Sequence, residues 1–335
     1  MCTAISMYNN YHYFGRTLDI EYSIEQNIVI TPRNFPFHFR NEKTIEHHFA
    51  IIGTAMACEG YPLYYEATNE AGLSIAGLNF AQSAFFHPFN KDMYNIETFE
   101  LIPWILSTCT DTESARRLIE RTNIMGSGFN AQYGAATLHW IIADKKSAIV
   151  LESTQDGIKT YDNPVGVLTN EPQFPYHLTN LNNYINLSTD SPKNRFCETI
   201  DISPYSNGMG AIGLPGDVSS ASRFVRAAFT KLNSVNELTE NQNVSQFFHI
   251  LGTVEQVRGC VRLTNGKHEI TAYTSCCNTD KCIYYYTTYE NRQITAVDMY
   301  SEKLDTSDLK VYPMRLQQNI FYENKVSCHL EQARA

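Results

Sequence analysis

The chain has 335 residues, of which 43% are hydrophobic and only 18% are charged, a composition that predicts a globular protein with a sizeable core. Its net charge of −9 and the lack of any long basic run argue against nucleic acid or an anionic membrane surface as a partner. No apolar stretch reaches about 18 residues, so we expect no transmembrane helix and no membrane insertion.

The cysteine content bears on the compartment of the protein. The nine cysteines are an odd number scattered along the chain. The N-terminus is polar as far as Tyr13 and lacks the basic and apolar segments of a secretory signal. We therefore predict reduced thiols in a cytoplasm rather than a disulfide framework.

The first predicted element is a strand over 3–7, which leads through a turn at Asn9 and Asn10 into a returning strand. Cys2 lies at its start, and removal of Met1 would leave Cys2 with both a thiol and a free α-amino group. An α-amine titrates at about 7.7 to 8.0 and a cysteine thiol at about 8.5, so the amine can accept the thiol proton near neutral pH. The alternative is an ordinary cysteine on a frayed terminus.

The returning strand would bring Arg16 and Asp19 back beside Cys2. Arg16 would then lower the pKa of the thiol, because a nearby positive charge favours the thiolate. Asp19 would accept hydrogen bonds from the α-amino group and orient it. The alternative is a surface Arg–Asp pair of little energetic value.

Hydrophobic alternation predicts further strands along the rest of the chain, over 28–31, 49–53, 73–78, 137–144, 147–152, 158–161, 281–286 and 293–297. Helical periodicity and capping residues predict helices over 98–109, 112–121 and 220–232, the last with Phe224, Ala227, Ala228 and Leu232 on its buried face. Short turns imply antiparallel sheets, and hairpins with intervening helices favour a layered α+β fold. The segment 189–216 is long and irregular, as functional or assembly loops are.

Three tempting motifs predict no cofactor or metal. Gly208, Gly210 and Gly213 match the dinucleotide pattern G-x-G-x-x-G, but neither a strand before it nor a helix within it is predicted. The cysteines at 276, 277 and 282 lack the second ligand pair of a zinc site. His139 lies in a predicted strand and is interpreted as a hydrogen-bonded core residue rather than a catalyst.

Several spaced blocks resemble the choloylglycine hydrolase family, which contains bile salt hydrolases and penicillin V acylases. The blocks are residues 1–3, 14–19, 76–80, 166–170, 213–217, 222–224, 273–276 and 284–291. The resemblance implies the N-terminal nucleophile hydrolase fold, a four-layer αββα sandwich of two antiparallel sheets between helices. It also implies one hydrolase domain over 1–329, with 189–216 as its assembly loop; residues 330–335 look unlike the rest and are interpreted as an added tail.

The resemblance also implies roles for particular residues. Cys2 would be the nucleophile, surrounded by Arg16, Asp19 and Arg223, and the oxyanion would be held by Asn170 and a backbone donor at Asn79. A steroid substrate needs a broad apolar surface, for which the candidates are Leu18, Met56, Tyr65, Phe129 and Leu138. For each of these five, ordinary packing is the alternative.

The implied reaction is hydrolysis of the amide bond of glycine- or taurine-conjugated bile salts through a Cys2 thioester, without cofactor or metal. The family's members are commonly homotetramers, and a bacterial cytoplasm is expected. A penicillin V acylase is the alternative within the family, although its acylases often carry Tyr where Asn79 stands. A non-catalytic binding protein on the same fold and a thiol redox protein using Cys276 and Cys277 also remain open.

Overall fold

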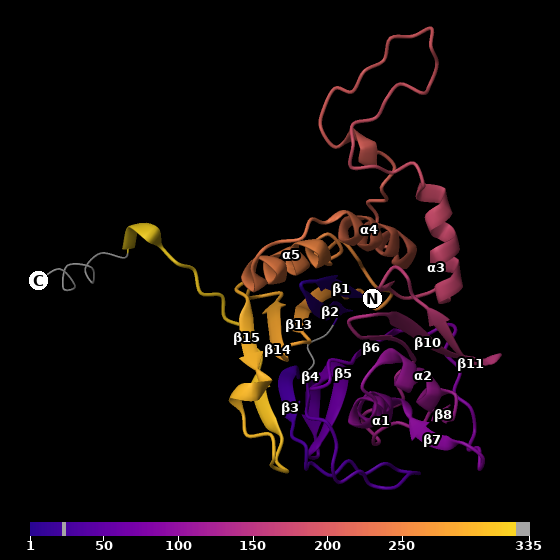
Figure 1. The fold of residues 1–335 in the computed structure, drawn as a ribbon, viewed down its shortest axis with the longest axis vertical. Helices are drawn as coiled ribbons and strands as arrows, with labels where there is room; N and C mark the ends of the chain where they lie inside the picture. Colours follow the sequence, from indigo (N-terminus) through magenta and orange to yellow (C-terminus); the bar gives the residue numbers. More distant parts are fainter. Residues whose placement is uncertain (22–24, 326–335) are drawn as a thin grey trace, which may run out of the picture.

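The computed structural model describes residues 1–21 and 25–325, and Figure 1 shows two sheets layered between helices. One sheet has six antiparallel strands. Their order is β12 (Val167–Leu168), β1 (Cys2–Asn9), β2 (Tyr11–Ile20), β13 (Ile270–Asn278), β14 (Ile283–Thr288) and β15 (Thr295–Asp298). The N-terminal strand therefore lies inside this sheet, paired on both sides.

The other sheet has eight strands, also antiparallel. Their order is β11 (Gly157–Asp162), β10 (Ala148–Thr154), β9 (Leu138–Ala143), β6 (Ser74–Asn79), β5 (Tyr61–Asn69), β4 (Ile51–Cys58), β3 (Asn27–Thr31) and β16 (Lys310–Pro313). A small parallel pair, β7 (Tyr94–Glu97) and β8 (Thr122–Met125), lies apart from both. The sheets contact each other through β1, β2 and β6.

Helices form the two outer layers. α4 (Ser220–Asn233) and α5 (Glu240–Gly252) pack on the six-stranded sheet, while α1 (Leu101–Thr108) and α2 (Thr112–Ile119) pack on the eight-stranded sheet. α3 (Phe174–Asn180) packs against α4. Short 3₁₀ turns cover Thr98–Glu100, Leu181–Tyr184, Met209–Ala211, Met299–Ser301 and Glu323–Lys325. This arrangement confirms the predicted four-layer αββα sandwich.

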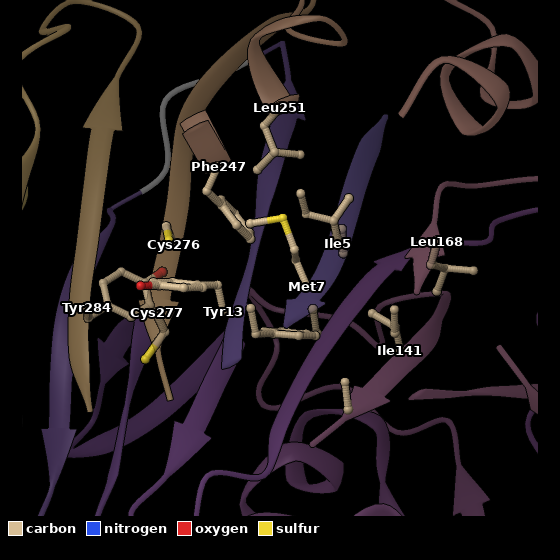
Figure 2. Packing of buried hydrophobic residues seen from close by; sticks show 14 of the residues in the cluster. Ile5, Met7, Tyr13, Ile141, Leu168, Phe247, Leu251, Cys276, Cys277 and Tyr284 are labelled. Atoms are coloured by element: carbon tan, nitrogen blue, oxygen red, sulfur yellow. The ribbon is translucent and has the colours of Figure 1, made fainter. Parts of the chain in front are cut away.

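The side chains of each strand point alternately to the two faces of its sheet, and this divides the interior into two cores. Ile141 of β9 belongs to the core that lies between the sheets and beneath α4 and α5, whereas Ile142 belongs to the core under α1 and α2. Figure 2 shows the first core, with Phe247 and Leu251 of α5 close to Met7 of β1. Because both faces of β3, β9 and β10 are buried, these strands contain the apolar runs 28–30, 140–143 and 148–151 in the sequence.

Most predicted elements are present within a few residues of their expected bounds, but α3, α5, β5, β7, β8, β13 and β16 were not predicted. One packing prediction was wrong: Leu232 is 60% exposed. It lies in the last turn of α4, beyond Ala228, where the buried residues of that helix end. The other three residues predicted for that face are buried.

The segment 189–216 is irregular except for one 3₁₀ turn, and it extends as a long loop away from the sandwich (Figure 1). Residues 330–335, interpreted above as an added tail, lie outside the described residues. The eight cysteines in the described ranges are all free thiols. Of the helices described, none is both long and apolar enough to cross a membrane.

Candidate active site

Cys2 lies at the start of β1, which is the second strand of the six-stranded sheet and is flanked by β12 and β2. It pairs with Leu18 across the hairpin, whose turn uses Asn10 at φ 59°; Asn tolerates this left-handed conformation better than most residues. The β1–β12 register, continued past Leu168, places Asn170 opposite Cys2. The Cys2 main-chain nitrogen donates to Oδ1 of Asn170 at 2.8 Å, and the Cys2 side chain is buried.

Alternation along the hairpin separates the site residues onto two faces. Arg16 and Leu18 share a face with the Cys2 side chain, toward the eight-stranded sheet. Thr3 and Asp19 point the other way, toward α4. Cys2 is therefore approached by cationic groups from both sides of its strand.

Arg16 is buried between the two sheets. Its Nε donates to the Thr17 carbonyl at 3.2 Å, and its Nη1 donates to the carbonyls of Gly77 and, at 3.3 Å, Tyr65. Tyr65 lies in a bulge between β4 and β5, which frees its carbonyl for this contact. None of these hydrogen bonds uses Nη2 of Arg16.

The charge of Arg16 is stabilised by its neighbours. Burial disfavours the guanidinium, but the negative charges available at Cys2, Tyr273 and Glu66 outweigh that effect and raise the pKa of Arg16. Oε2 of Glu66 lies 3.9 Å from Nε of Arg16 and accepts from the Tyr273 hydroxyl at 2.6 Å. The permanent positive charge beside Cys2 is suited to stabilising a thiolate.

Gly15 is needed because β13 approaches β2 closely. A Cβ added at Gly15 would lie 2.0 Å from the Ser275 carbonyl oxygen, a distance that no side chain can occupy. The Ser275 hydroxyl in turn accepts from the Arg16 main-chain nitrogen at 3.1 Å. The glycine that precedes Arg16 in sequence thus sets the position of Arg16 on the sheet.

Asp19 is held by two hydroxyl groups on the opposite face. Thr271 donates to its Oδ1 at 2.7 Å and Thr17 to its Oδ2 at 3.3 Å. The Thr271 hydroxyl accepts from the Gln256 main-chain nitrogen at 2.7 Å, which directs its proton at the carboxylate. Burial raises the pKa of Asp19, opposed chiefly by the nearby positive charge of Arg223.

Arg223 reaches the site from α4. Its Nη1 donates to the Cys2 carbonyl at 2.5 Å and to the Thr3 hydroxyl at 2.7 Å, and its Nη2 donates to Oδ1 of Asn170 at 2.7 Å. Burial lowers the pKa of Arg223, with Asp19 and Cys2 opposing that shift. Arg223 thereby links the nucleophile to the residue opposite it.

The start of α4 is organised by Asp217, which fixes the direction from which Arg223 enters. The Asp217 carboxylate accepts from the Ser219 main-chain nitrogen at 3.0 Å and from the Ser222 hydroxyl at 2.5 Å. Hydrogen bonds from Ser219 and Ser222 lower the pKa of Asp217 to about 2. The first turn of the helix is stabilised by an acidic group, as its dipole favours.

Asn170 and Asn79 meet at the end of β6. Nδ2 of Asn170 donates to the Asn79 carbonyl at 2.8 Å, so one of its two N–H groups is left for a substrate oxygen. Within a strand, the N–H and C=O of one residue point to the same side, so the Asn79 N–H also faces this edge. The Asn79 side chain is exposed. An oxyanion could be held between these two donors.

Three of the predicted substrate-binding residues border this arrangement. Leu18 lies opposite Cys2, and Leu138 lies opposite Asn79. Tyr65 contributes its carbonyl to Arg16. The structure therefore places these three residues next to residues of the candidate site, and their role in substrate binding stays a prediction.

The other two lie farther out. Met56 is on β4, opposite Leu63. The ring of Phe129 packs against Tyr61 at 5.8 Å and Phe99 at 5.2 Å between centroids. Neither residue contacts Cys2 in the interactions found for residues 1–21 and 25–325, so their role in substrate binding stays a prediction.

Met1 occupies the position beyond Cys2 and pairs with β2. Its ammonium group donates to the Asp19 carbonyl at 2.8 Å and to the Glu269 carboxylate, and its carbonyl accepts from the Asp19 nitrogen at 2.9 Å. With Met1 present, the Cys2 nitrogen is an amide that cannot act as a base. The hydrogen bond predicted between Asp19 and a free α-amine therefore stays a prediction.

Sequence reasoning missed Glu66, Thr271 and Glu269. The first lies on β5 and the others on or beside β13, strands whose pairing with the hairpin depends on contacts far apart in sequence. In the described part of the chain, no three His, Cys, Asp or Glu side chains cluster as metal ligands would.

Comparison with known sequences gives consistent findings. The family model described as linear amide C–N hydrolases, choloylglycine hydrolase family, matches residues 2–312. A bile salt hydrolase/transferase of Lactiplantibacillus plantarum is 51% identical over 324 residues, 97% of this chain and 100% of that protein. A bile salt hydrolase/transferase of Clostridium perfringens is 36% identical, covering 93% and 96%.

Solved structures agree with these matches. A conjugated bile acid hydrolase of Clostridium perfringens superposes with a TM-score of 0.90 at 35% identity, covering 97% of this chain and 100% of that chain. A penicillin V acylase of Agrobacterium tumefaciens superposes with a TM-score of 0.75 at 17% identity, covering 92% and 90%. At that identity, the second likeness concerns the fold alone.

Proposed function

The chain belongs to the choloylglycine hydrolase family of linear amide C–N hydrolases, and we propose that it hydrolyses glycine- or taurine-conjugated bile salts through Cys2. The observation that carries the proposal is the placement of Cys2 between two buried arginines and opposite Asn170. The names of its relatives, bile salt hydrolases and a conjugated bile acid hydrolase, support the substrate class.

Removal of Met1 converts the Cys2 nitrogen into an α-amine that accepts the thiol proton. Arg16 stabilises the thiolate, which attacks the amide carbonyl carbon of the substrate. The carbonyl oxygen becomes an oxyanion held by Nδ2 of Asn170 and the main-chain N–H of Asn79. Removing one such donor typically costs about 2.7 to 4 kcal/mol of transition-state stabilisation.

Collapse of the tetrahedral intermediate breaks the C–N bond. The protonated α-amine gives its proton to the departing nitrogen, so glycine or taurine leaves as a free amine and a thioester remains on Cys2. The neutral α-amine next takes a proton from water, and the resulting hydroxide attacks the thioester carbon. The C–S bond breaks, which restores the thiolate, and the bile acid leaves as a carboxylate after its acid proton passes to the released amine.

The substrate class is tested by a side-by-side assay of glycocholate, taurocholate and penicillin V with the enzyme lacking Met1. We expect kcat/KM for at least one bile salt to exceed that for penicillin V by at least about tenfold. This ratio corresponds to a difference of about 1.4 kcal/mol in transition-state binding. The measurement is amine release under initial-rate conditions. Preference for penicillin V would contradict the bile-salt assignment while leaving the Cys2 mechanism in place.

The redox alternative is disfavoured by the surroundings of Cys276 and Cys277. Both side chains are buried, and burial raises the pKa of each thiol well above its ordinary value. The thiolate is the reactive form of cysteine, so these two residues are poorly placed for exchange with a partner disulfide.

We also propose that the protein forms a homotetramer and that it works in the bacterial cytoplasm. The loop 189–216 carries large apolar side chains in water, among them Phe196 at 82% and Tyr205 at 86% exposure. Large apolar side chains gathered in one exposed loop favour association with another subunit. The bacterial sources of the relatives and the free cysteines support the compartment.

Changing Phe196→Ser together with Tyr205→Ser should dissociate the tetramer, because both side chains would lose their apolar contacts with a neighbouring subunit. Light scattering at micromolar concentration measures the mass of each protein. The matched control is Leu238→Ser, which removes a side chain that is 91% exposed outside this loop. A monomeric wild-type protein, or a double variant that stays tetrameric, would contradict the assignment.

A further inference from the structure

His139 is buried in β9 and touches both segments that supply the proposed oxyanion donors. Its ring stacks on Phe80, the residue after Asn79, with centroids 4.3 Å apart and planes 6° apart. Its Nε2 lies 3.0 Å from the carbonyl oxygen of Thr169, the residue before Asn170. One side chain thus spans the gap between the two chain segments that must hold a substrate oxygen.

The other ring nitrogen is fixed as well. Nδ1 of His139 lies 3.1 Å from Oε1 of Glu152 on β10, which is fully buried. A main-chain carbonyl can only accept, so Nε2 carries a proton, and a second proton is shared between Nδ1 and the carboxylate. His139 therefore links Thr169 to Glu152 through its two ring nitrogens. Rotation of the ring or a change of tautomer would break a buried hydrogen bond.

Glu152 extends the connection to α3. Its Oε1 also accepts from the Phe174 main-chain nitrogen at 2.9 Å, at the first residue of that helix. From the same helix, Nε2 of His177 donates to the Asn170 carbonyl at 2.9 Å. The carbonyls of two consecutive residues, Thr169 and Asn170, are thus each held by a buried histidine.

We propose that His139, supported by Glu152, is a positioning residue that sets the separation of Asn170 and Asn79 for the transition state. The inference rests on the proposed function, since it assumes that these two residues stabilise the oxyanion. His139 does not touch the substrate. Its effect is geometric: displacement of a catalytic donor by about 1 Å can cost roughly a hundredfold in rate.

Two substitutions separate the ring stacking of His139 from its hydrogen bonds. His139→Phe keeps a ring on Phe80 but removes both hydrogen bonds, and we expect kcat to fall roughly 10- to 100-fold with KM changed less than about threefold. His139→Gln keeps an N–H where Nε2 stood and should recover part of the lost kcat. The assay is hydrolysis of glycocholate by protein lacking Met1.

A second readout distinguishes positioning from general damage. Alkylation of Cys2 by iodoacetamide, followed by intact mass, needs the thiolate but forms no oxyanion, so its rate should stay within about twofold of wild type in both variants. A parallel fall in alkylation and kcat would overturn the proposal, as would full kcat in His139→Phe. Should that variant fail to fold, Glu152→Gln decides, with the same split between kcat and alkylation expected.

His12 provides a matched control. It is also a buried histidine, bonded at 2.8 Å to the hydroxyls of Ser6 and Thr279 at the other end of the β1–β2 hairpin. His12→Phe should lower the melting temperature without lowering kcat. If Cys2→Ala retains full activity, the proposed function fails; if Cys2→Ala is inactive while His139→Phe is fully active, this inference alone fails.

Discussion

Replacing Cys2 by Ala should abolish release of glycine or taurine from conjugated bile salts. The substitution removes the sulfur that forms the thioester, and no neighbouring group can replace it. Arg16 and Arg223 carry guanidinium groups that only donate hydrogen bonds, and the side chain of Asn170 is an amide, so none of the three is a nucleophile. Loss of an enzyme nucleophile typically lowers kcat by at least about four orders of magnitude. Amine release by a ninhydrin-type assay, with substrate well above KM, measures the loss.

Cys2→Ser is the companion variant. It keeps a nucleophilic atom at the same position, but a hydroxyl is far less acidic than a thiol, so the α-amine cannot generate the alkoxide near neutral pH. We expect it to be almost as inactive as the alanine variant. Turnover at the wild-type rate by either protein would show that Cys2 is not the nucleophile.

The same variants test the alternative of a non-catalytic binding protein. A protein of that kind would bind glycocholate equally well in its wild-type and Cys2→Ala forms and would hydrolyse it in neither. Calorimetric titration of the alanine variant, paired with turnover by the wild type, therefore separates the two. An unchanged melting temperature establishes that the variant is folded.

The parts of the site that could be predicted from residues alone are those within one hairpin. Cys2, Arg16 and Asp19 are joined by a tight turn, so a local pattern of strand, Asn-containing turn and strand was enough to bring them together. Asn79 and Asn170 lie on other strands and would otherwise have been interpreted as turn residues. Their assignment came through family resemblance, as did that of Arg223 on α4.

β13 shows why an element can escape prediction from the sequence. β13 contains Thr271, Thr274 and Ser275, all buried, because these polar side chains bond to groups on β2 and on the loop after α5. Their burial cannot be read from hydrophobic alternation. Thr271 bonds to Asp19 of β2, which is 252 residues away in sequence, so no local pattern predicts the contact.

The interior charges explain why the site needs so many supporting groups. Arg16 and Glu66 lie on one face of the hairpin, and Asp19 and Arg223 lie on the other. A buried charge is tolerated only when it is paired and hydrogen-bonded. Each charge here has such partners, so the site can present two cations to a developing thiolate without a net excess of buried charge.

Retention of Met1 should inactivate the enzyme while leaving its fold unchanged. The Cys2 nitrogen would remain an amide that donates to Asn170 and cannot accept the thiol proton. Acid–base assistance of this kind is typically worth about 100- to 10,000-fold, so we expect at least a hundredfold lower kcat. Met1 also fits the sheet, pairing with Asp19 and binding Glu269, so the unprocessed chain should fold normally.

Two proteins that differ by this single residue can be made from a fusion whose protease leaves no added residues, one beginning at Met1 and the other at Cys2. Intact mass before and after each assay confirms the terminus, and melting temperatures confirm the fold. Iodoacetamide should also modify the Met1 form more slowly, because its thiol lacks the adjacent base. Equal turnover by the two forms, with Met1 still present at the end of the assay, would show that the α-amine takes no part in catalysis.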